Sequence, residues 1–147
     1  MKKLFILIFA VTFTACNAPV EPQGAGFFTA QPGEKYITGS DDVTDVWVKY
    51  IEAHNNRQID AIMSMETDSI SITGPDGSRI NGKEMHEQAL NAWFPAEDPK
   101  WEIYWAMPYK AINKDESWVI AGHWVDLTIE GETLRKAHMI DARIVNG

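Results

Sequence analysis

The residue with the most distinctive chemistry is Cys16, the only cysteine among the 147 residues of the chain. Lys2 and Lys3 precede it, and the stretch 4–15 in between is apolar or small throughout. A basic start followed by an apolar run too short to cross a bilayer as a mature helix is typical of a secretory signal peptide. The sequence therefore predicts that residues 1–15 direct the chain out of the cytoplasm.

The four residues Phe13-Thr14-Ala15-Cys16 resemble the lipobox at which bacterial lipoproteins are cut before a lipidated cysteine. The motif departs from the usual pattern at Phe13, where leucine is common. The resemblance implies a lipid anchor on Cys16 and a place in the cell envelope, on the periplasmic side or at the cell surface. The alternative is an ordinary secretory signal with an incidental cysteine. If Cys16 is acylated no thiol remains, so we expect neither a disulfide nor a thiolate–metal site.

Two of the four histidines, His123 and His138, fall opposite each other in a predicted hairpin. If Glu130-Gly131 is a two-residue turn, residues whose numbers sum to 261 face each other. This register also produces favourable cross-strand pairs, namely Asp126 with Arg135 and Thr128 with Thr133. Two facing imidazoles could be half of a metal site. No carboxylate or further histidine shares their face, however, so we expect no metal.

The same register sorts the side chains of the hairpin into two faces. One face carries Ile120, Gly122, Trp124, Ala137, Met139, Asp141 and Arg143. The other carries His123, Val125, Leu127, Ile129, Leu134, His138 and Ile140. Because the second face is apolar apart from its histidines, we expect it to be a packing or dimerisation surface, with dimers that loosen below about pH 6 as the imidazoles become charged.

Helices are predicted ahead of these strands. Ser40 is a suitable N-cap, and the residues after it place apolar side chains at three- and four-residue spacing as far as Asn55-Asn56. The stripe consists of Val43, Val46, Trp47, Tyr50, Ile51 and His54. A second short helix is expected from about Asp60 and a third from about Asn81 to Pro95.

From residue 101 onward the period of the apolar residues changes from helical to two. Five large side chains are expected on one strand face, namely Trp101, Ile103, Trp105, Met107 and Tyr109. Two long strands, 117–129 and 133–145, follow. Helices followed by an antiparallel meander predict an α+β domain with the helices packed on one face of the sheet.

Composition limits the organisation and the partners of the chain. Residues 16–39 are rich in proline, glycine and small polar residues, and we interpret them as a flexible tether ahead of one domain, 40–147. The formal net charge of −8 argues against nucleic acid as a partner and against electrostatic adsorption to lipid, which leaves the acyl chains on Cys16 as the expected membrane contact. Six tryptophans indicate either a heavy core or a ligand cavity with aromatic walls.

The order of these motifs resembles the nuclear transport factor 2-like superfamily, which includes SnoaL-like polyketide cyclases and ketosteroid isomerases. The resemblance covers residues 40–147 and rests on 47–56, 58–63, 74–77 ahead of 82–84, and 139–147. It implies a cone-shaped (cystatin-like) fold, in which a curved antiparallel sheet packs on N-terminal helices around a pocket. It also implies a homodimer through the outer face of the sheet. Family members usually add one more long strand, so the last strand is expected to be missing here.

The resemblance to ketosteroid isomerases also implies roles for particular residues. Tyr50 matches the tyrosine that donates a hydrogen bond to the developing oxyanion, and Asp141 matches the neighbouring protonated aspartic acid. The general base falls at Gly74, which cannot accept a proton. His54, one helical turn after Tyr50, is a candidate substitute. Alternatively, Tyr50 is a core residue, and an ionised Asp141 beside Arg143 recognises a polar ligand group.

Three functions stay open at this level. The first is a lipid-anchored, non-catalytic module that binds a small apolar or aromatic ligand without a cofactor or a metal. Its pocket residues are Trp47, Trp93, Trp105, Trp118, Trp124, Met139 and Arg143. The second is an enzyme of the isomerase, dehydratase or cyclase type that uses Tyr50, Asp141 and His54. The third is a structural or partner-binding envelope lipoprotein that acts through its sheet face or its acidic surface.

Overall fold

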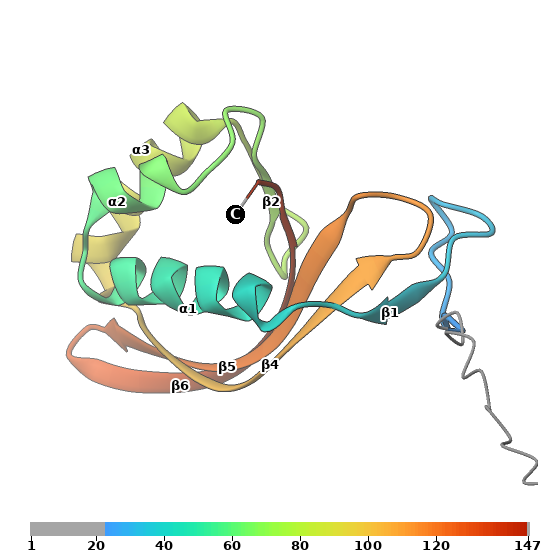
Figure 1. Cartoon of the computed structure of the whole chain (residues 1–147). Coiled ribbons are helices and arrows are strands. Elements are labelled where there is room, and N and C mark those ends of the chain that lie inside the picture. Colours follow the sequence, from blue (N-terminus) through green and yellow to red (C-terminus); the bar gives the residue numbers. More distant parts are fainter. Residues whose placement is uncertain (1–22, 147) are drawn as a thin grey trace, which may run out of the picture.

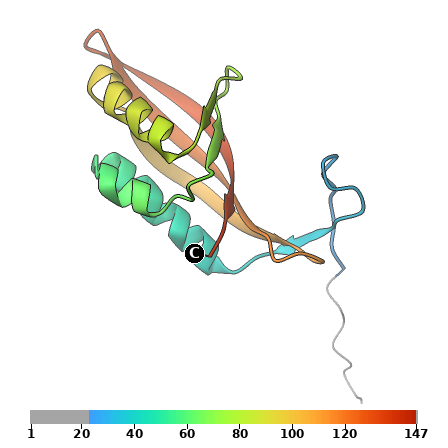
Figure 2. The same cartoon turned by 90° about the horizontal axis from the view of Figure 1, so that it is seen from above.

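A computed structural model describes residues 23–146, in which helices cover one side of a curved antiparallel sheet (Figures 1 and 2). The elements are β1 (Tyr36–Thr38), α1 (Asp41–Asn55), α2 (Ile59–Ser64), β2 (Ser71–Thr73), β3 (Arg79–Asn81), α3 (Lys83–Glu97), β4 (Lys100–Ala111), β5 (Ser117–Ile129) and β6 (Glu132–Ile144). The predicted signal peptide and Cys16 lie outside the described residues. None of the described helices has the length and apolar character needed to cross a membrane.

The main sheet has the strand order β1-β4-β5-β6, and β2 and β3 form a separate two-stranded sheet. The helix α1 lies over β4 and β5, and α3 lies over β5. The predicted α+β class with a curved antiparallel sheet is confirmed. Within residues 23–146, β6 is an edge strand paired only with β5.

The helix α1 begins and ends as the sequence predicts. Ser40 is its N-cap, and the Ser40 Oγ accepts a hydrogen bond from the backbone N–H of Asp42 at 3.4 Å. The acidic side chains of Asp41 and Asp42 stabilise the positive end of the helix dipole. Its apolar stripe is buried against the sheet through Val43, Trp47 and Ile51. The third helix differs in one detail, because it continues past Pro95 to Glu97.

The hairpin of β5 and β6 has the predicted register. Glu130 and Gly131 have φ angles of 53° and 84°, so both adopt the left-handed conformation that a two-residue type I′ turn requires. Opposite residues include His123 with His138 and Ile120 with Asp141. Near the turn of the hairpin, the Arg135 guanidinium donates two hydrogen bonds to the Asp126 carboxylate at 2.6 and 2.8 Å.

The face of this hairpin that was expected to line the pocket, with Trp124, Met139 and Arg143, is not the inner face. The face with His123 and Val125 is the inner face, since its residues on β5 are buried beneath the helices. Of the two roles expected for this face, packing or dimerisation, packing is the one observed, and the cover of the helices excludes the other. The face with Trp124 and Met139 is the outer face, and the Met139 side chain is 70% exposed.

A β-bulge in β4 overturns the prediction that five large side chains share one face. Ile103 pairs with His123 but Trp105 pairs with Gly122, so Tyr104 is an extra residue in the ladder. An inserted residue reverses the alternation of side chains beyond it. As a result Trp101 and Ile103 face the helices, whereas Trp105, Met107 and Tyr109 lie on the outer face.

The last part of the predicted tether is folded. Tyr36–Thr38 forms β1, which pairs with the C-terminal end of β4. Ahead of it, Ala25 and Tyr36 exchange two backbone hydrogen bonds of 2.9 and 3.0 Å. The boundary at residue 39 is therefore too late, because backbone pairing and aromatic packing fix the segment from Gly24 onward.

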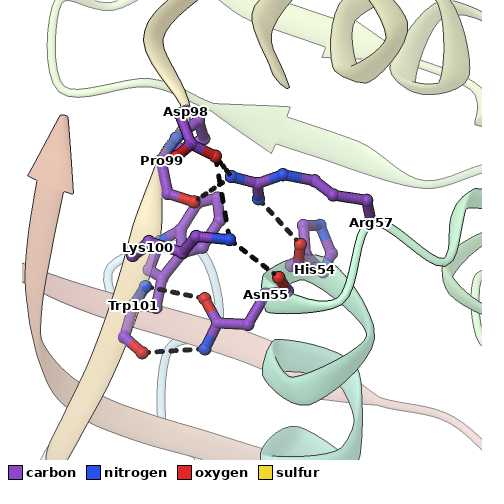
Figure 3. A network of polar contacts seen from close by, with 7 residues as sticks. All are labelled: His54, Asn55, Arg57, Asp98, Pro99, Lys100 and Trp101. Atoms are coloured by element: carbon purple, nitrogen blue, oxygen red, sulfur yellow. Dashed lines mark hydrogen bonds and ion pairs between the residues drawn. The ribbon is translucent and has the colours of Figure 1, made fainter. Parts of the chain in front are cut away.

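A polar network fastens the C-terminal end of α1 to the start of β4 (Figure 3). The Asn55 side-chain amide exchanges two hydrogen bonds of 2.8 Å with the backbone N–H and C=O of Trp101, so it occupies the place of a neighbouring strand. Arg57, which has a positive φ of 59°, donates to the His54 and Pro99 carbonyls and to the Asp98 carboxylate. These contacts fix α1 above the inner face.

Candidate functional site

Three aromatic side chains of α1 point into the interior of the domain, namely Trp47, Tyr50 and His54. The Trp47 indole N–H donates a hydrogen bond to His123 Nε2 on β5 at 3.0 Å, and both side chains are buried. The neutral His123 ring therefore carries its proton on Nδ1. Burial and the neighbouring His138 lower the pKa of His123, which favours this neutral form.

The Tyr50 hydroxyl is engaged within the helical layer. It donates a hydrogen bond of 2.6 Å to Glu66 Oε1, and His86 Nδ1 lies 2.6 Å from the same oxygen. The Glu66 side chain is only 1% exposed, and its Oε2 has no hydrogen-bond partner among the described residues. The Tyr50–Glu66–His86 network thus joins α1, the segment after α2, and α3 around one buried carboxyl group.

This environment fixes the chemistry of the Tyr50 phenol. Burial, the hydrogen bond to Glu66 and the charge of Glu66 raise the pKa of Tyr50 far above its usual value. A phenol with such a pKa donates a hydrogen bond but does not release its proton near neutral pH. Its donor is directed to Glu66, so the hydroxyl is an anchor of the helical layer.

His54 lies on the same helix face, one turn further on. Its Nδ1 is 2.8 Å from the Tyr50 carbonyl oxygen, an arrangement in which the ring N–H donates. Burial is the main reason why the pKa of His54 falls to about 4. The ring is therefore neutral near pH 7 and contacts the rings of Tyr50 and Trp101.

Asp141 does not join Tyr50. It lies on the outer face of β6, where its Oδ1 accepts a hydrogen bond of 2.6 Å from the Tyr109 hydroxyl. The sheet separates this carboxyl group from the helices, because side chains on a strand alternate between faces and Asp141 has the parity of the outer face. The predicted pair of Tyr50 and Asp141 is wrong, and so is the arrangement of an oxyanion site around it.

Most of the predicted pocket residues are also on the outer face. Trp105, Trp118, Trp124, Met139 and Arg143 all share the side of Asp141. Trp47 is on the helical side, as predicted. So is Trp93 on α3, which donates a hydrogen bond of 2.7 Å to Glu97 and packs edge-on against Trp101.

The surface of the described residues includes two hollows. One, of about 590 Å³, lies at the start of α3 and is lined by residues that include Asp68, Asn81 and Lys83. The other, of about 500 Å³, lies beside β1 and the turn between β4 and β5. None of the predicted pocket residues lines either hollow.

One apolar part of the inner face is only half-buried. His138, Ile140, Ala142 and Ile144, which we call the concave strip, follow one another along the inner face of β6. The three apolar members contact the core cluster that contains Trp47. The concave strip is therefore an apolar surface at the edge of the core, with an imidazole at one end.

Glu66 and His86 are the residues of this interior that sequence reasoning missed. Neither belongs to a recognisable motif, and they are 20 positions apart on different elements. The only sequence signal was a charged residue close to the apolar positions of a short helix, which is common on solvated surfaces. Among residues 23–146 no group of three or more metal-ligating side chains comes together.

The fold is the nuclear transport factor 2-like, or cystatin-like, fold of several solved structures. An LEH-like epoxide hydrolase of M. tuberculosis matches with a TM-score of 0.62 at 13% identity, over 73% of this chain and 76% of that one. A ketosteroid isomerase-like protein from Erwinia carotovora atroseptica matches with a TM-score of 0.56 at 19% identity, over 69% and 78%. A cystatin fold protein from Novosphingobium aromaticivorans matches with a TM-score of 0.54 at 21% identity, over 74% and 92%.

At these identities the likeness establishes the fold and no activity. No protein-family model and no curated protein sequence matches the chain.

Proposed function

We propose that this protein is a lipid-anchored domain of the cell envelope that binds a small, largely apolar ligand on the concave side of its sheet. The anchor is the lipidated Cys16, and the domain has the nuclear transport factor 2-like fold. The proposal makes the domain a carrier or receptor, with no cofactor and no metal.

The concave strip is the observation that carries this proposal. Ile140, Ala142 and Ile144 are only half-buried although they contact the core. A small apolar molecule that covered them would gain about 25 cal/mol for each Å² of apolar surface removed from water. His138 at one end of the strip supplies a ring nitrogen for a polar group of the ligand.

Tyr50 packs against Trp47, a member of the core cluster that the concave strip contacts. The Tyr50 ring packs on Trp47, with 5.5 Å between ring centroids, and Glu66 holds its hydroxyl. An isomerase mechanism would need a proton acceptor and two donors at one point. Position 74 is a glycine and Asp141 is on the outer face, so the proposal is binding without turnover.

The proposal is tested by filling the concave strip. Ala142→Phe adds an aromatic ring on the inner face, and Ala137→Phe makes the same change on the outer face of the same strand. Titration with 1-anilinonaphthalene-8-sulfonate, an anionic fluorophore with a large aromatic surface, should show at least tenfold weaker binding for Ala142→Phe and unchanged binding for Ala137→Phe. Equal affinities for the two variants would contradict a ligand site on the concave side.

A second candidate function is association with a second copy of the chain through the outer face of the sheet. Four large side chains there are strongly exposed, namely Tyr104, Met107, Trp124 and Met139. Both arginines named on this face pair with acids of the same chain: Arg135 with Asp126 and Glu102, and Arg143 with Glu116. In a chain of net charge −8, the uncharged apolar centre of this face is where two copies would repel each other least.

A further inference from the structure

One end of the sheet, at which β1 pairs with β4, exposes large apolar side chains. We call this end the β1 end, and it consists of residues 24–38 and 110–117 (Figure 1). Phe27, which lies between the bridge residues Ala25 and Phe28, is 76% exposed, the highest value among the large hydrophobic side chains of the described residues. Ile112, in the adjacent turn between β4 and β5, is 39% exposed.

The loop that carries Phe27 is held rigidly. The neighbouring Phe28 ring lies among the rings of Tyr36, Tyr109 and Trp118, with centroid distances of 4.7, 6.4 and 6.3 Å. The Ile112 backbone N–H also donates to the Lys35 carbonyl at 2.9 Å. Phe28 is thus packed into an aromatic cluster, whereas the neighbouring Phe27 side chain is left exposed.

Charge at the β1 end differs from that of the whole molecule. Lys35, Lys110 and Lys114 are exposed there, against one exposed acid, Asp115. The other acids of this end are withdrawn from the surface. Glu34 is buried and accepts hydrogen bonds from Asn113, and Glu116 is half-buried beside Arg143. An exposed phenylalanine beside lysines is the side-chain combination found where proteins contact an anionic lipid surface.

The chain length between the anchor and the domain brings this end to the membrane. Cys16 precedes Gly24 by eight residues, and Ala25 is already hydrogen-bonded to Tyr36. A fully extended segment of that length spans at most about 28 Å. A lipid on Cys16 would therefore keep the β1 end within this distance of the bilayer, whereas the turn at Glu130 lies at the far end of β5.

We propose that the β1 end is a membrane-docking surface, in which Phe27 enters the interface of the bilayer and Lys35, Lys110 and Lys114 contact anionic headgroups. The docking rests on the lipid anchor of the proposed function and adds an orientation to it. With the β1 end on the membrane, β5 and β6 rise away from the lipid, and the domain stands upright with the far turn in the aqueous phase.

The docking is tested with one fluorophore at two positions. If Cys16 is acylated, Phe27→Cys and Glu130→Cys each introduce the only free thiol of the chain. The full-length lipidated proteins are labelled with a nitrobenzoxadiazole thiol reagent and placed in vesicles of phosphatidylethanolamine and phosphatidylglycerol. The probe at position 27 should emit at shorter wavelength than the probe at position 130, and only the former should be quenched by doxyl-labelled lipid.

Anchoring and docking fail in distinguishable ways. If both probes emit alike in vesicles that retain the protein, docking is overturned and the anchor stands. If the unaltered chain carries no lipid, the anchor is overturned and the docking that rests on it falls too. If a Cys16→Ser chain partitions into membranes equally well, the anchor alone is overturned. Charge reversal at Lys110 and Lys114 should weaken quenching at position 27 in anionic vesicles but not in purely zwitterionic ones.

Discussion

At the level of single residues, Tyr50 has the position that the isomerase resemblance implies but not the contacts that the implied role requires. It lies on the inner stripe of α1, where the isomerase resemblance places an oxyanion donor, yet its hydroxyl contacts Glu66 at 2.6 Å. The acid expected beside it, Asp141, accepts from Tyr109 on the other side of the sheet. We therefore assign Tyr50 a structural role, in which its hydrogen bond to Glu66 stabilises the packing of the helices.

Removal of the Tyr50 hydroxyl should destabilise the fold. In Tyr50→Phe the buried carboxylate of Glu66 loses one of its two hydrogen-bond partners, which costs about 1–3 kcal/mol of the free energy of unfolding. Urea denaturation measures the difference. Tyr104→Phe is the matched control, because Tyr104 is exposed on the outer face. Identical stabilities of the two variants would show that the Glu66 contact contributes nothing.

The low pKa of the buried His54 ring predicts that the fold loses stability in acid. Its pKa is about 4 in the folded state, mainly because of burial, and about 6.5 in the unfolded chain. Because the folded protein binds the proton less readily than the unfolded chain, the neutral ring makes its full contribution to stability above about pH 6.5. This contribution is lost as the pH falls from there toward 4. The loss amounts to about 2–3 kcal/mol.

The effect of His54 is separated from that of the carboxylates by comparison with His54→Gln. The unaltered chain should lose about 2 kcal/mol more than the variant between pH 7 and pH 4.5 in urea unfolding. If the variant does not fold, a nuclear magnetic resonance titration of the ring gives the answer directly. A ring that becomes protonated near pH 6.5 in the folded protein contradicts this account.

At the level of elements, features set by local sequence could be predicted, whereas features set by contacts distant in sequence could not. The hairpin register follows from Glu130-Gly131, because the two positive φ values of its turn leave no freedom in which residues pair. The choice of inner face does not follow, since both faces contain large apolar side chains. Helices cover the face with His123, and only contacts distant in sequence, such as Trp47 to His123, decide this.

Neither the bulge at Tyr104 nor the network at Glu66 could be predicted from the sequence, because neither has a local sequence signal. A single inserted residue leaves no local signal in an aromatic strand, yet it moves Trp105 to the outer face. Glu66 and His86 meet only because α2 packs on both α1 and α3. The helices, by contrast, were predictable from caps and periodicity, as at Ser40.

The attachment of α1 to β4 depends on one side chain. Asn55→Ala removes both hydrogen bonds to the Trp101 backbone and leaves its N–H and C=O without these partners, which should cost about 2 kcal/mol. Asn56→Ala, one residue further along at the exposed C-cap, should change stability by less than about 0.5 kcal/mol. Thermal or urea unfolding of both variants makes the comparison, and equal losses would refute the role assigned to Asn55.

At the level of the whole molecule, the outer face should govern self-association. Met139→Asp places a charge at the centre of the exposed apolar cluster and should shift the chain toward monomer by at least tenfold in dissociation constant. Met85→Asp, a matched change at a 48% exposed methionine on α3, should leave association unchanged. Sedimentation velocity on the chain from residue 17 onward distinguishes the two. A monomeric parent chain would remove the second candidate function.

The most direct test of the central claim, that a ligand binds on the concave side of the sheet, is to locate a bound molecule by magnetic resonance. With methyl-labelled protein and bound 1-anilinonaphthalene-8-sulfonate, intermolecular nuclear Overhauser effects should reach the methyl groups of Ile140, Ala142 and Ile144. Effects confined to the methyl groups of Met107 and Met139 would place the ligand on the outer face and contradict the proposed function.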